Sequence, residues 1–424
     1  MSTDLTEKYN RAKSNADTDY NASIKTLLEI IRSSNIDEVE DGIKLQEQSI
    51  YLLGEIYVKR NMADELKKLI DIIKPIIGNL PKARVAKIIR NLMDMMAKIP
   101  DTEKLQEDLC LECIQWCVDE KRTFLRHRIT ARLAMVYLNA SMFMKGLEHI
   151  ENLIKEVKKV DDKILLVEIY LIESKLEYRI RNIPKSKAAL TAARTNANSI
   201  HCPPLLQADI DLQSGIILAD EGDYKTSFSY FYEAFEAFNI ANDERALCSL
   251  KYMLLSKIMS QQTSNISSLL SGKNKIKFQN REIEALRMVA SCYENRSLNM
   301  FEEVLEKYKD ELTSDLVINK HISDLCENLM ERNINRILEA YSHIEISKLS
   351  DFLRLPFERV YNKVIDMILN KKIHGNIDQK TGILTLFDEN SDSSFNSMVD
   401  NLILTFGNLS NVVDLLYEKA SKTV

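Results

Sequence analysis

The chain has 424 residues, 45% of them apolar, which is enough for about two or three folded units. Its 57 Lys and Arg against 63 Asp and Glu give a formal net charge of −6, which disfavours binding to nucleic acid through overall charge. Ten glycines and seven prolines make up about 4% of the residues, against about 12% in average proteins. So few turn formers exclude a β-sandwich or barrel and predict a mostly α protein.

The N-terminal residues 1–13 are polar and charged and lack the apolar core of a signal peptide. Charged residues interrupt every apolar run before it reaches the length of a membrane helix, so we expect a soluble protein with no membrane partner. Seven cysteines, scattered between Cys110 and Cys326, are typical of reduced thiols rather than of a disulfide framework. These features predict a location in the cytoplasm and nucleus.

From residue 23 the apolar residues recur at helical spacing, and small residues recur with a period of about 40. Ala134, Ser174 and Gly215 follow one another at this period. Twelve residues after each comes another small residue, and four further on a large apolar one: Gly146, Ser186, Ser227, then Ile150, Leu190, Phe231. Small pairs let the two helices of a hairpin approach closely, and the pattern predicts a tetratricopeptide-like α-solenoid.

The period is less regular toward the N-terminus. Gly54 lies two periods before Ala134, but Leu66, twelve residues after Gly54, is not small. Unrelated amphipathic hairpins with a chance spacing are therefore the alternative interpretation. Either arrangement is helical and offers long surfaces of the kind that bind proteins.

The helical pattern changes after Tyr341. Residues 346–353 predict a short helix, and Pro356 precedes or begins a second helix that runs to about residue 371. Segments 373–378 and 383–387 alternate in polarity on either side of a turn, which predicts a β-hairpin. Two short helices followed by a hairpin describe a winged helix.

The second strand of this hairpin is apolar on both faces. One face carries Ile383, Thr385 and Phe387, and the other carries Leu384 and Leu386. An exposed strand with two apolar faces is unusual, so we predict that it forms a free edge of the sheet and that a partner protein covers one of its sides.

A seam of apolar residues with alternating spacings of four and three follows a polar linker near the end of the chain: Phe395, Val399, Leu402, Phe406, Leu409, Val413 and Leu416. This spacing predicts a helix with a coiled-coil-like seam. Further apolar residues widen the seam on both flanks, so we expect it to enter a helical bundle with other chains. The alternative is that the helix folds back onto its own domain.

No motif of an enzyme or metal site is present. The six histidines form no zinc-binding helix signature, and neither a nucleophile elbow nor a phosphate-binding glycine loop occurs. Cys110 and Cys113 form a CxxC pair with Cys117 nearby, but their spacing fits the apolar stripe of a helix, so we interpret them as core residues. We predict no catalytic residue, no metal and no cofactor.

The winged helix raises the alternative of nucleic-acid binding. Its second helix carries Arg359, Lys363, Lys371 and Lys372 against two acidic residues. A local balance of about +2 is poor for a helix that must neutralise several phosphates, so we predict a solvated charged face and no nucleic-acid partner.

Several segments closely resemble the 26S proteasome non-ATPase regulatory subunit 11 family of PCI-domain lid subunits. They span most of the chain and include SKAALTAARTNANSIHCPP (186–204), GDYKTSFSYFYEAFEAF (222–238), LKYMLLSKIM (250–259) and FERVYNKVIDMILNKKIHGNIDQKTGILTLFDE (357–389). The resemblance implies a right-handed tetratricopeptide-like solenoid followed by a PCI domain with a winged helix and a C-terminal helix. The expected domains are repeats in 1–205, the helical part of the PCI domain in 206–340, its winged helix in 341–390 and an assembly helix in 391–424.

The resemblance also implies a role. The family contributes a non-catalytic scaffold that joins the lid, the ATPase ring and the α ring of the core particle, and so supports ATP-dependent degradation of ubiquitinated proteins. Its partners are other PCI-domain lid subunits, the deubiquitinase module, the ATPases and the core particle. A PCI subunit of the COP9 signalosome or of a translation initiation complex is the alternative within this fold class, and a winged-helix nucleic-acid binder is the alternative from another class.

Overall fold

The computed structural model describes residues 9–14, 20–32, 40–76, 82–100, 102–260, 280–294, 298–313, 315–378, 381–387, 398–399, 401–410 and 412–413. The chain is mostly helical, as its composition predicts, and forms two compact units, Met1–Ala246 and Leu247–Val424. Within the described ranges, no helix is both long enough and apolar enough to cross a membrane.

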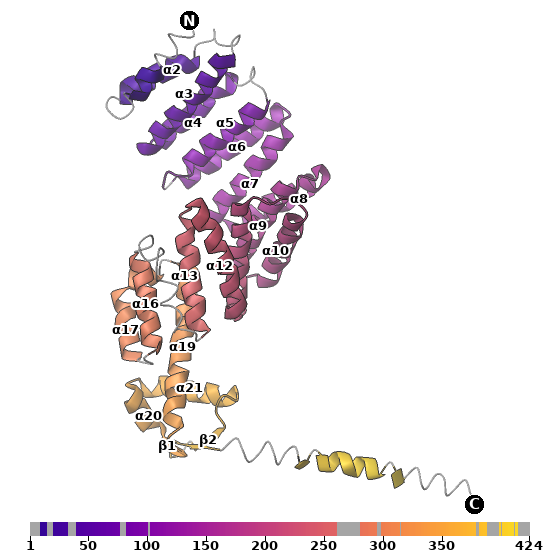
Figure 1. Ribbon diagram of the computed structural model, residues 1–424, viewed down its shortest axis with the longest axis vertical. Coiled ribbons are helices and arrows are strands. Elements are labelled where there is room, and N and C mark those ends of the chain that lie inside the picture. Colours follow the sequence, from indigo (N-terminus) through magenta and orange to yellow (C-terminus); the bar gives the residue numbers. More distant parts are fainter. Residues whose placement is uncertain are drawn as a thin grey trace, which may run out of the picture. The chain divides into compact units, whose positions relative to one another are not determined.

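The first unit is a stack of antiparallel helices, most of which pack on the next helix in the chain (Figure 1). Its helices are α2 (Tyr20–Arg32), α3 (Glu40–Lys59), α4 (Ala63–Ile76), α5 (Lys82–Met96), α6 (Glu103–Asp119), α7 (Thr123–Asn139), α8 (Phe143–Val160), α9 (Lys163–Arg179), α10 (Ile183–Asn198), α11 (Pro204–Asp220) and α12 (Tyr224–Ala241). The first helices of successive hairpins also contact one another, α3 with α5, α7 with α9 and α9 with α11. This arrangement is the predicted tetratricopeptide-like solenoid.

The small residues spaced twelve apart lie at a close contact between the two helices of a hairpin. The Ser186 hydroxyl donates to the Ser174 carbonyl over 2.8 Å, and the Ser227 hydroxyl donates to the Gly215 carbonyl over 2.9 Å. In the preceding hairpin, a Cβ on Gly146 of α8 would lie 3.4 Å from the Tyr137 Cβ of α7, so the two helices are in van der Waals contact there. The period is therefore a true packing repeat, and the chance-spacing interpretation is wrong for these three hairpins.

The backbone keeps this period where the side chains lose it. The turns between the two helices of a hairpin place one residue each in the left-handed region: Asn61 (φ 55°), Ser141 (φ 60°), Arg181 (φ 71°) and Gly222 (φ 87°). The last three follow one another at the period of the small residues, and Asn61 lies two periods before Ser141. The hairpin of α3 and α4 therefore belongs to the same series, although Leu66 fills the position of the small residue.

Replacing Gly215 by alanine is expected to lower the free energy of unfolding by about 1–3 kcal/mol, because the added Cβ overpacks the hairpin. That atom would lie 2.5–2.9 Å from three ring carbons of Phe231, which is 1% exposed and cannot move away. This cost exceeds the gain of about 1 kcal/mol from the better helix propensity of alanine. Urea denaturation followed by circular dichroism measures the difference.

Gly54→Ala is the matched control. Its Cβ would lie 2.7 Å from the Met95 sulfur, the mobile part of a flexible and only partly buried side chain. We expect a change below about 1 kcal/mol, since the propensity gain offsets a small adjustment. Equal destabilisation by the two substitutions would contradict the close-contact explanation.

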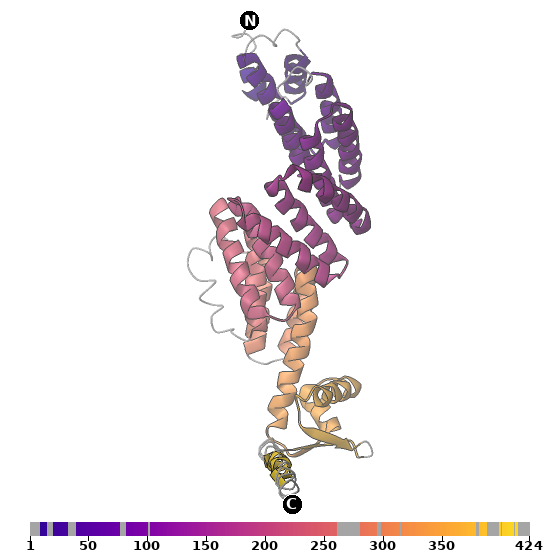
Figure 2. The same cartoon turned by 90° about the vertical axis from the view of Figure 1, so that its right-hand side faces the viewer.

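The second unit combines a helical layer with a winged helix. Its elements are α13 (Arg245–Met259, which begins two residues before the unit boundary), α16 (Arg281–Glu294), α17 (Leu298–Lys307), α18 (Lys309–Thr313), α19 (Leu316–Leu338), β1 (His343–Glu345), α20 (Ile346–Leu353), α21 (Phe357–Leu369), β2 (Gly375–Asp378) and β3 (Ile383–Leu386). The long helix α19 packs on α17 and α18 and, at its other end, on α20, as Figure 2 shows. The winged-helix core consists of fully buried apolar side chains: Ile346, Leu349, Val360, Val364, Met367 and Leu384.

The two units divide later in the chain than the domain boundary that we expected between residues 205 and 206. Helix α11 begins at Pro204 and packs on α9 and α10, and α12 completes its hairpin. The compact first unit therefore continues to Ala246, and the helical part of the second unit begins at Leu247.

Candidate protein-interaction surfaces

The sheet of the winged helix has three antiparallel strands in the order β1-β3-β2. The prediction that residues 383–387 form its free edge is wrong. The short strand β1 pairs with β3 on the side opposite β2, so that β3 is the central strand. The edges of the sheet are β1 and β2.

The two faces of β3 differ in exposure. Leu384 is 0% exposed and lies opposite Ile344, which is also buried, so this face belongs to the core of the winged helix. On the other face, Ile383 and Thr385 are partly exposed and Phe387 is 56% exposed. Leu386, on the inner face, is also partly exposed, so the most exposed apolar side chain that β3 and its end offer to a partner is Phe387 on the outer face.

The hydrogen-bond register shows which edge groups face outward. Leu386 N–H donates to the Ser342 carbonyl, and Ile346 N–H donates to the Gly382 carbonyl. Hydrogen-bonded pairs alternate along an antiparallel ladder, so the backbone groups of His343 and Glu345 point away from β3. The sheet can be extended at this edge by a strand from another chain.

The residues of the C-terminal seam that the structure describes lie on the surface. The helical segment 401–410 and its described flanks expose five of the seven: Val399 (36%), Leu402 (54%), Phe406 (68%), Leu409 (61%) and Val413 (56%). Phe395 and Leu416 lie outside the described residues. In these ranges no seam residue is buried in a core of its own chain, so the seam is available to other helices.

Two lysines pair with acidic residues of α19: Lys363 in α21 and Lys372 shortly after it. Lys363 Nζ lies 3.0 Å from a Glu327 carboxylate oxygen and 3.1 Å from one of Glu331, and Lys372 Nζ lies 2.6 Å from Glu331. The Lys363 side chain is 13% exposed. The prediction of a solvated face is wrong for Lys363, and the paired lysines are less able to bind phosphates than the sequence suggests.

Glu331 is the centre of this cluster. Burial opposes its ionisation, but hydrogen bonds from Lys372 and Lys363 outweigh that effect and hold the pKa of Glu331 below its ordinary value. Replacing Glu331 by glutamine is expected to lower the free energy of unfolding by about 1–3 kcal/mol at pH 7, because charge-assisted hydrogen bonds are lost. Thermal unfolding of the full chain measures the effect.

The pH dependence of this effect has a defined sign. Since the folded-state pKa of Glu331 is depressed, its stabilisation is complete above the ordinary value of 4.5 and is lost as the pH falls through the folded-state pKa. The difference between the wild type and Glu331→Gln should therefore shrink in acid. Glu327→Gln, at a carboxylate 66% exposed, is the control and should cost less than about 1 kcal/mol. Equal effects of the two substitutions would contradict the central role of Glu331.

The CxxC cysteines belong to a core, as predicted. Cys110, Cys113 and Cys117 are 3%, 0% and 1% exposed within the apolar cluster of the first helices. Burial raises the pKa of Cys110 to about 12 and that of Cys117 to about 11, so these thiols stay protonated and unreactive at neutral pH. Among the described residues, no group of three or more His, Cys, Asp or Glu side chains could hold a metal ion.

Each of the two units contains a match to a known family model. Residues 5–140 match the model of the 26S proteasome regulatory subunit RPN6 N-terminal domain, and residues 305–388 match the PCI domain. The chain is 43% identical over 383 residues to the 26S proteasome non-ATPase regulatory subunit 11 homolog of Arabidopsis thaliana, with 90% of each chain covered. The chain belongs to the Rpn6 family. It is also 41% identical over 415 residues to the probable 26S proteasome regulatory subunit rpn6 of Schizosaccharomyces pombe, with 97% of each chain covered.

A further Rpn6 relative is the 26S proteasome regulatory subunit RPN6 of Saccharomyces cerevisiae, 38% identical over 382 residues that cover 89% of this chain and 87% of the relative. The resemblance drawn from the sequence segments is thereby confirmed. The PCI match ends just after β3 and includes all three strands of the sheet, among them β1, which the sequence analysis missed. A three-residue strand between two helices is too short for alternation to reveal it.

Proposed function

We propose that the chain is a non-catalytic scaffold subunit of the 26S proteasome lid that joins the lid, the ATPase ring and the α ring of the core particle. The observation that carries this proposal is its similarity, over about nine-tenths of its length or more, to proteins named as proteasome regulatory subunits. The fold supports it, because a helical solenoid and a winged helix provide surfaces rather than an enclosed catalytic site. In this role the chain supports ATP-dependent degradation of ubiquitinated proteins in the cytoplasm and nucleus.

Two kinds of surface suit assembly. The β1 and β2 edges can continue into the sheets of other PCI-domain lid subunits, and the exposed C-terminal seam can enter a bundle with their helices and with the deubiquitinase module. The solenoid offers the surface for the ATPases and the core particle. The relatives are named as regulatory subunits, which favours the absence of enzyme activity.

Affinity purification of the tagged full chain from its own cells, followed by mass spectrometry, tests the proposal. We expect lid subunits, ATPases and core-particle subunits in near-equal amounts. Recovery of signalosome or initiation-complex subunits instead would favour the alternative within this fold class. Hydrolase and ATPase assays on the purified chain should show no turnover that follows its chromatographic peak.

A further inference from the structure

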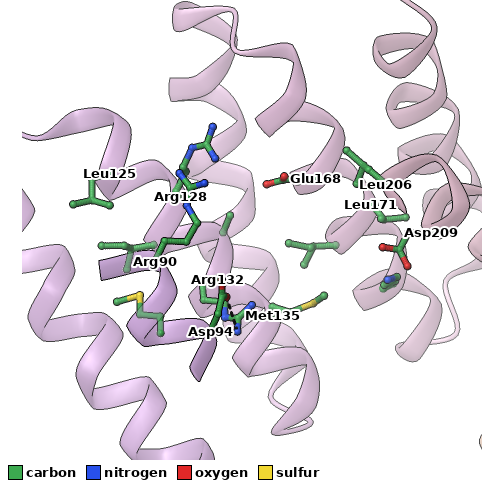
Figure 3. Close-up of a pocket in the computed structure, with 15 residues that line it drawn as sticks. Arg90, Asp94, Leu125, Arg128, Arg132, Met135, Glu168, Leu171, Leu206 and Asp209 are labelled. Atoms are coloured by element: carbon green, nitrogen blue, oxygen red, sulfur yellow. Dashed lines mark ion pairs between the residues drawn. The ribbon is translucent and has the colours of Figure 1, made fainter. Parts of the chain in front are cut away.

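A cavity of about 340 Å³ lies within the first unit, between the first helices of four successive hairpins, α5, α7, α9 and α11. Its walls combine apolar side chains, among them Leu125, Ile129 and Leu171, with charged groups that point inward (Figure 3). All of its walls therefore come from the layer that the first helices of the hairpins form. The family comparison assigns no ligand to this place.

The charges around the cavity do not balance. Arg132 pairs with Asp94 at 3.2 Å, and Asp209 pairs with Arg245 at 2.6 Å. These pairs leave two arginines of the cavity wall, Arg90 and Arg128, facing a single carboxylate, Glu168. Lys175 also lines the wall, but burial lowers its pKa and its charged neighbours are Asp209 and Arg245. In the described part of the chain, neither arginine has an ion-pair partner at direct contact distance. An excess of positive charge inside a chain with a net charge of −6 attracts anionic groups locally.

Glu168 does not neutralise the arginines well. Figure 3 shows it across the cavity from Arg128 and Arg90. Burial raises the pKa of Glu168 in spite of both arginines, so the protein environment disfavours its charged form. A carboxylate supplied from outside can make the direct contacts with the arginines that Glu168 does not make.

Beside the cavity, exposed apolar side chains repeat with the period of the solenoid and form an apolar rim. Phe124, Ile164 and Leu205 are the second residues of α7, α9 and α11, and they are 65%, 40% and 39% exposed. Phe124 and Leu205 directly precede Leu125 and Leu206, which line the cavity. A surface row of large apolar side chains at equivalent positions of three hairpins is typical of an interaction site.

We propose that this cavity and its apolar rim bind an extended segment of a partner protein in which acidic and apolar side chains alternate. Carboxylates of the segment contact Arg90 and Arg128, and its apolar side chains pack on the rim formed by Phe124, Ile164 and Leu205. An extended segment suits the site because each residue advances the chain by about 3.3 Å, so about three residues span the roughly 8–10 Å between neighbouring helices. The proposal does not depend on membership in the lid.

Fluorescence anisotropy with a labelled decapeptide of alternating Glu and Leu, titrated with the full chain, tests this inference. We expect saturable binding that weakens with salt, no binding of an alternating Lys and Leu peptide, and roughly tenfold or more weaker binding of a Glu and Ser peptide. Hydrogen exchange should show protection by the Glu and Leu peptide in α5, α7, α9 and α11.

Substitutions separate the site from a general charge effect. Arg128→Glu should weaken binding of the Glu and Leu peptide about tenfold or more, because it removes a charge-assisted contact and adds repulsion. Glu168→Gln should strengthen binding, since it removes the competing negative charge. Lys155→Glu, an equal change of charge at an exposed residue of α8 outside the cavity, should leave binding unchanged.

Three results would overturn the proposal: no saturable binding of the Glu and Leu peptide, equal weakening by Lys155→Glu and Arg128→Glu, or equal binding of the Glu and Ser peptide. Circular dichroism melting of each variant establishes that it is folded. Glu168→Gln tests the site with almost no change of side-chain volume, so its result stands even if Arg128→Glu is poorly folded.

Discussion

Replacing Leu402, Phe406 and Leu409 together by aspartate is expected to abolish incorporation of the chain into the lid, while the melting temperature of the isolated chain changes by less than about 2 °C. The three side chains are 54%, 68% and 61% exposed, so their replacement removes no core contact within the described residues. In a helical bundle the same positions would be buried, where three unpaired carboxylates are strongly destabilising. Native gel electrophoresis of lid assembled with the variant, beside thermal unfolding of the variant alone, measures both effects.

A matched variant controls for charge and helix propensity. This variant adds the same number of carboxylates to the same helical segment, at positions outside the seam: Asn401→Asp, Thr405→Asp and Asn408→Asp. We expect this variant to assemble normally. If the seam variant instead melts far below the wild type, the seam belongs to the chain's own core. If both variants fail to assemble to the same extent, the seam acts only through the stability of the helix.

The fold was largely predictable because its strongest signals are local. Small residues twelve apart define the contact between two helices of a hairpin, and that contact is visible in the sequence since both residues are small or polar. The boundaries of α20 agree with the predicted helix 346–353, because an amphipathic stripe and a following proline mark its ends. Where Leu66 replaces the small residue, only the left-handed turn at Asn61 keeps the period, and backbone dihedrals leave little trace in the sequence.

The parts that were predicted wrongly depend on partners distant in the chain. The strand β1 precedes both helices of the winged helix, whereas β3 follows them, and their pairing converts the presumed edge into the centre of the sheet. Lys363 finds its acidic partners on α19, which precedes β1 and α20, so the charge count of α21 alone could not show that it is paired. The charges of the cavity come from four helices and were missed for the same reason.

Leu384→Pro is expected to unfold the winged helix, with a loss of about 3 kcal/mol or more in its free energy of unfolding. Leu384 lies in the central strand, is 0% exposed and pairs with Ile344 on one side and Ile377 on the other. Proline removes a ladder hydrogen bond of this strand and a buried side chain together. A failure of this variant to assemble would therefore show loss of fold, and limited proteolysis of residues 341–387 should detect it in the isolated chain.

The free edges are tested by substitutions that keep the sheet intact. Glu345 has a φ of −76° and an outward-facing N–H, so proline fits there, and Glu345→Pro should change the free energy of unfolding by less than about 1 kcal/mol. Its exposed ion pair with Lys348 adds little stability, and Glu345→Gln controls for that loss. On the β2 edge, Phe387 N–H donates to the His374 carbonyl, so the alternation places the N–H of Ile377 outward as well.

If the sheet continues into a neighbouring subunit, Glu345→Pro or Ile377→Pro must lower lid incorporation by removing a donor from the intermolecular ladder, whereas Glu345→Gln must not. Normal incorporation of both proline variants, with the fold retained in each, would exclude sheet extension at either edge. Assembly would then rest on the C-terminal seam and on the outer face that carries Phe387, and a Phe387→Asp variant would be the one to lose incorporation.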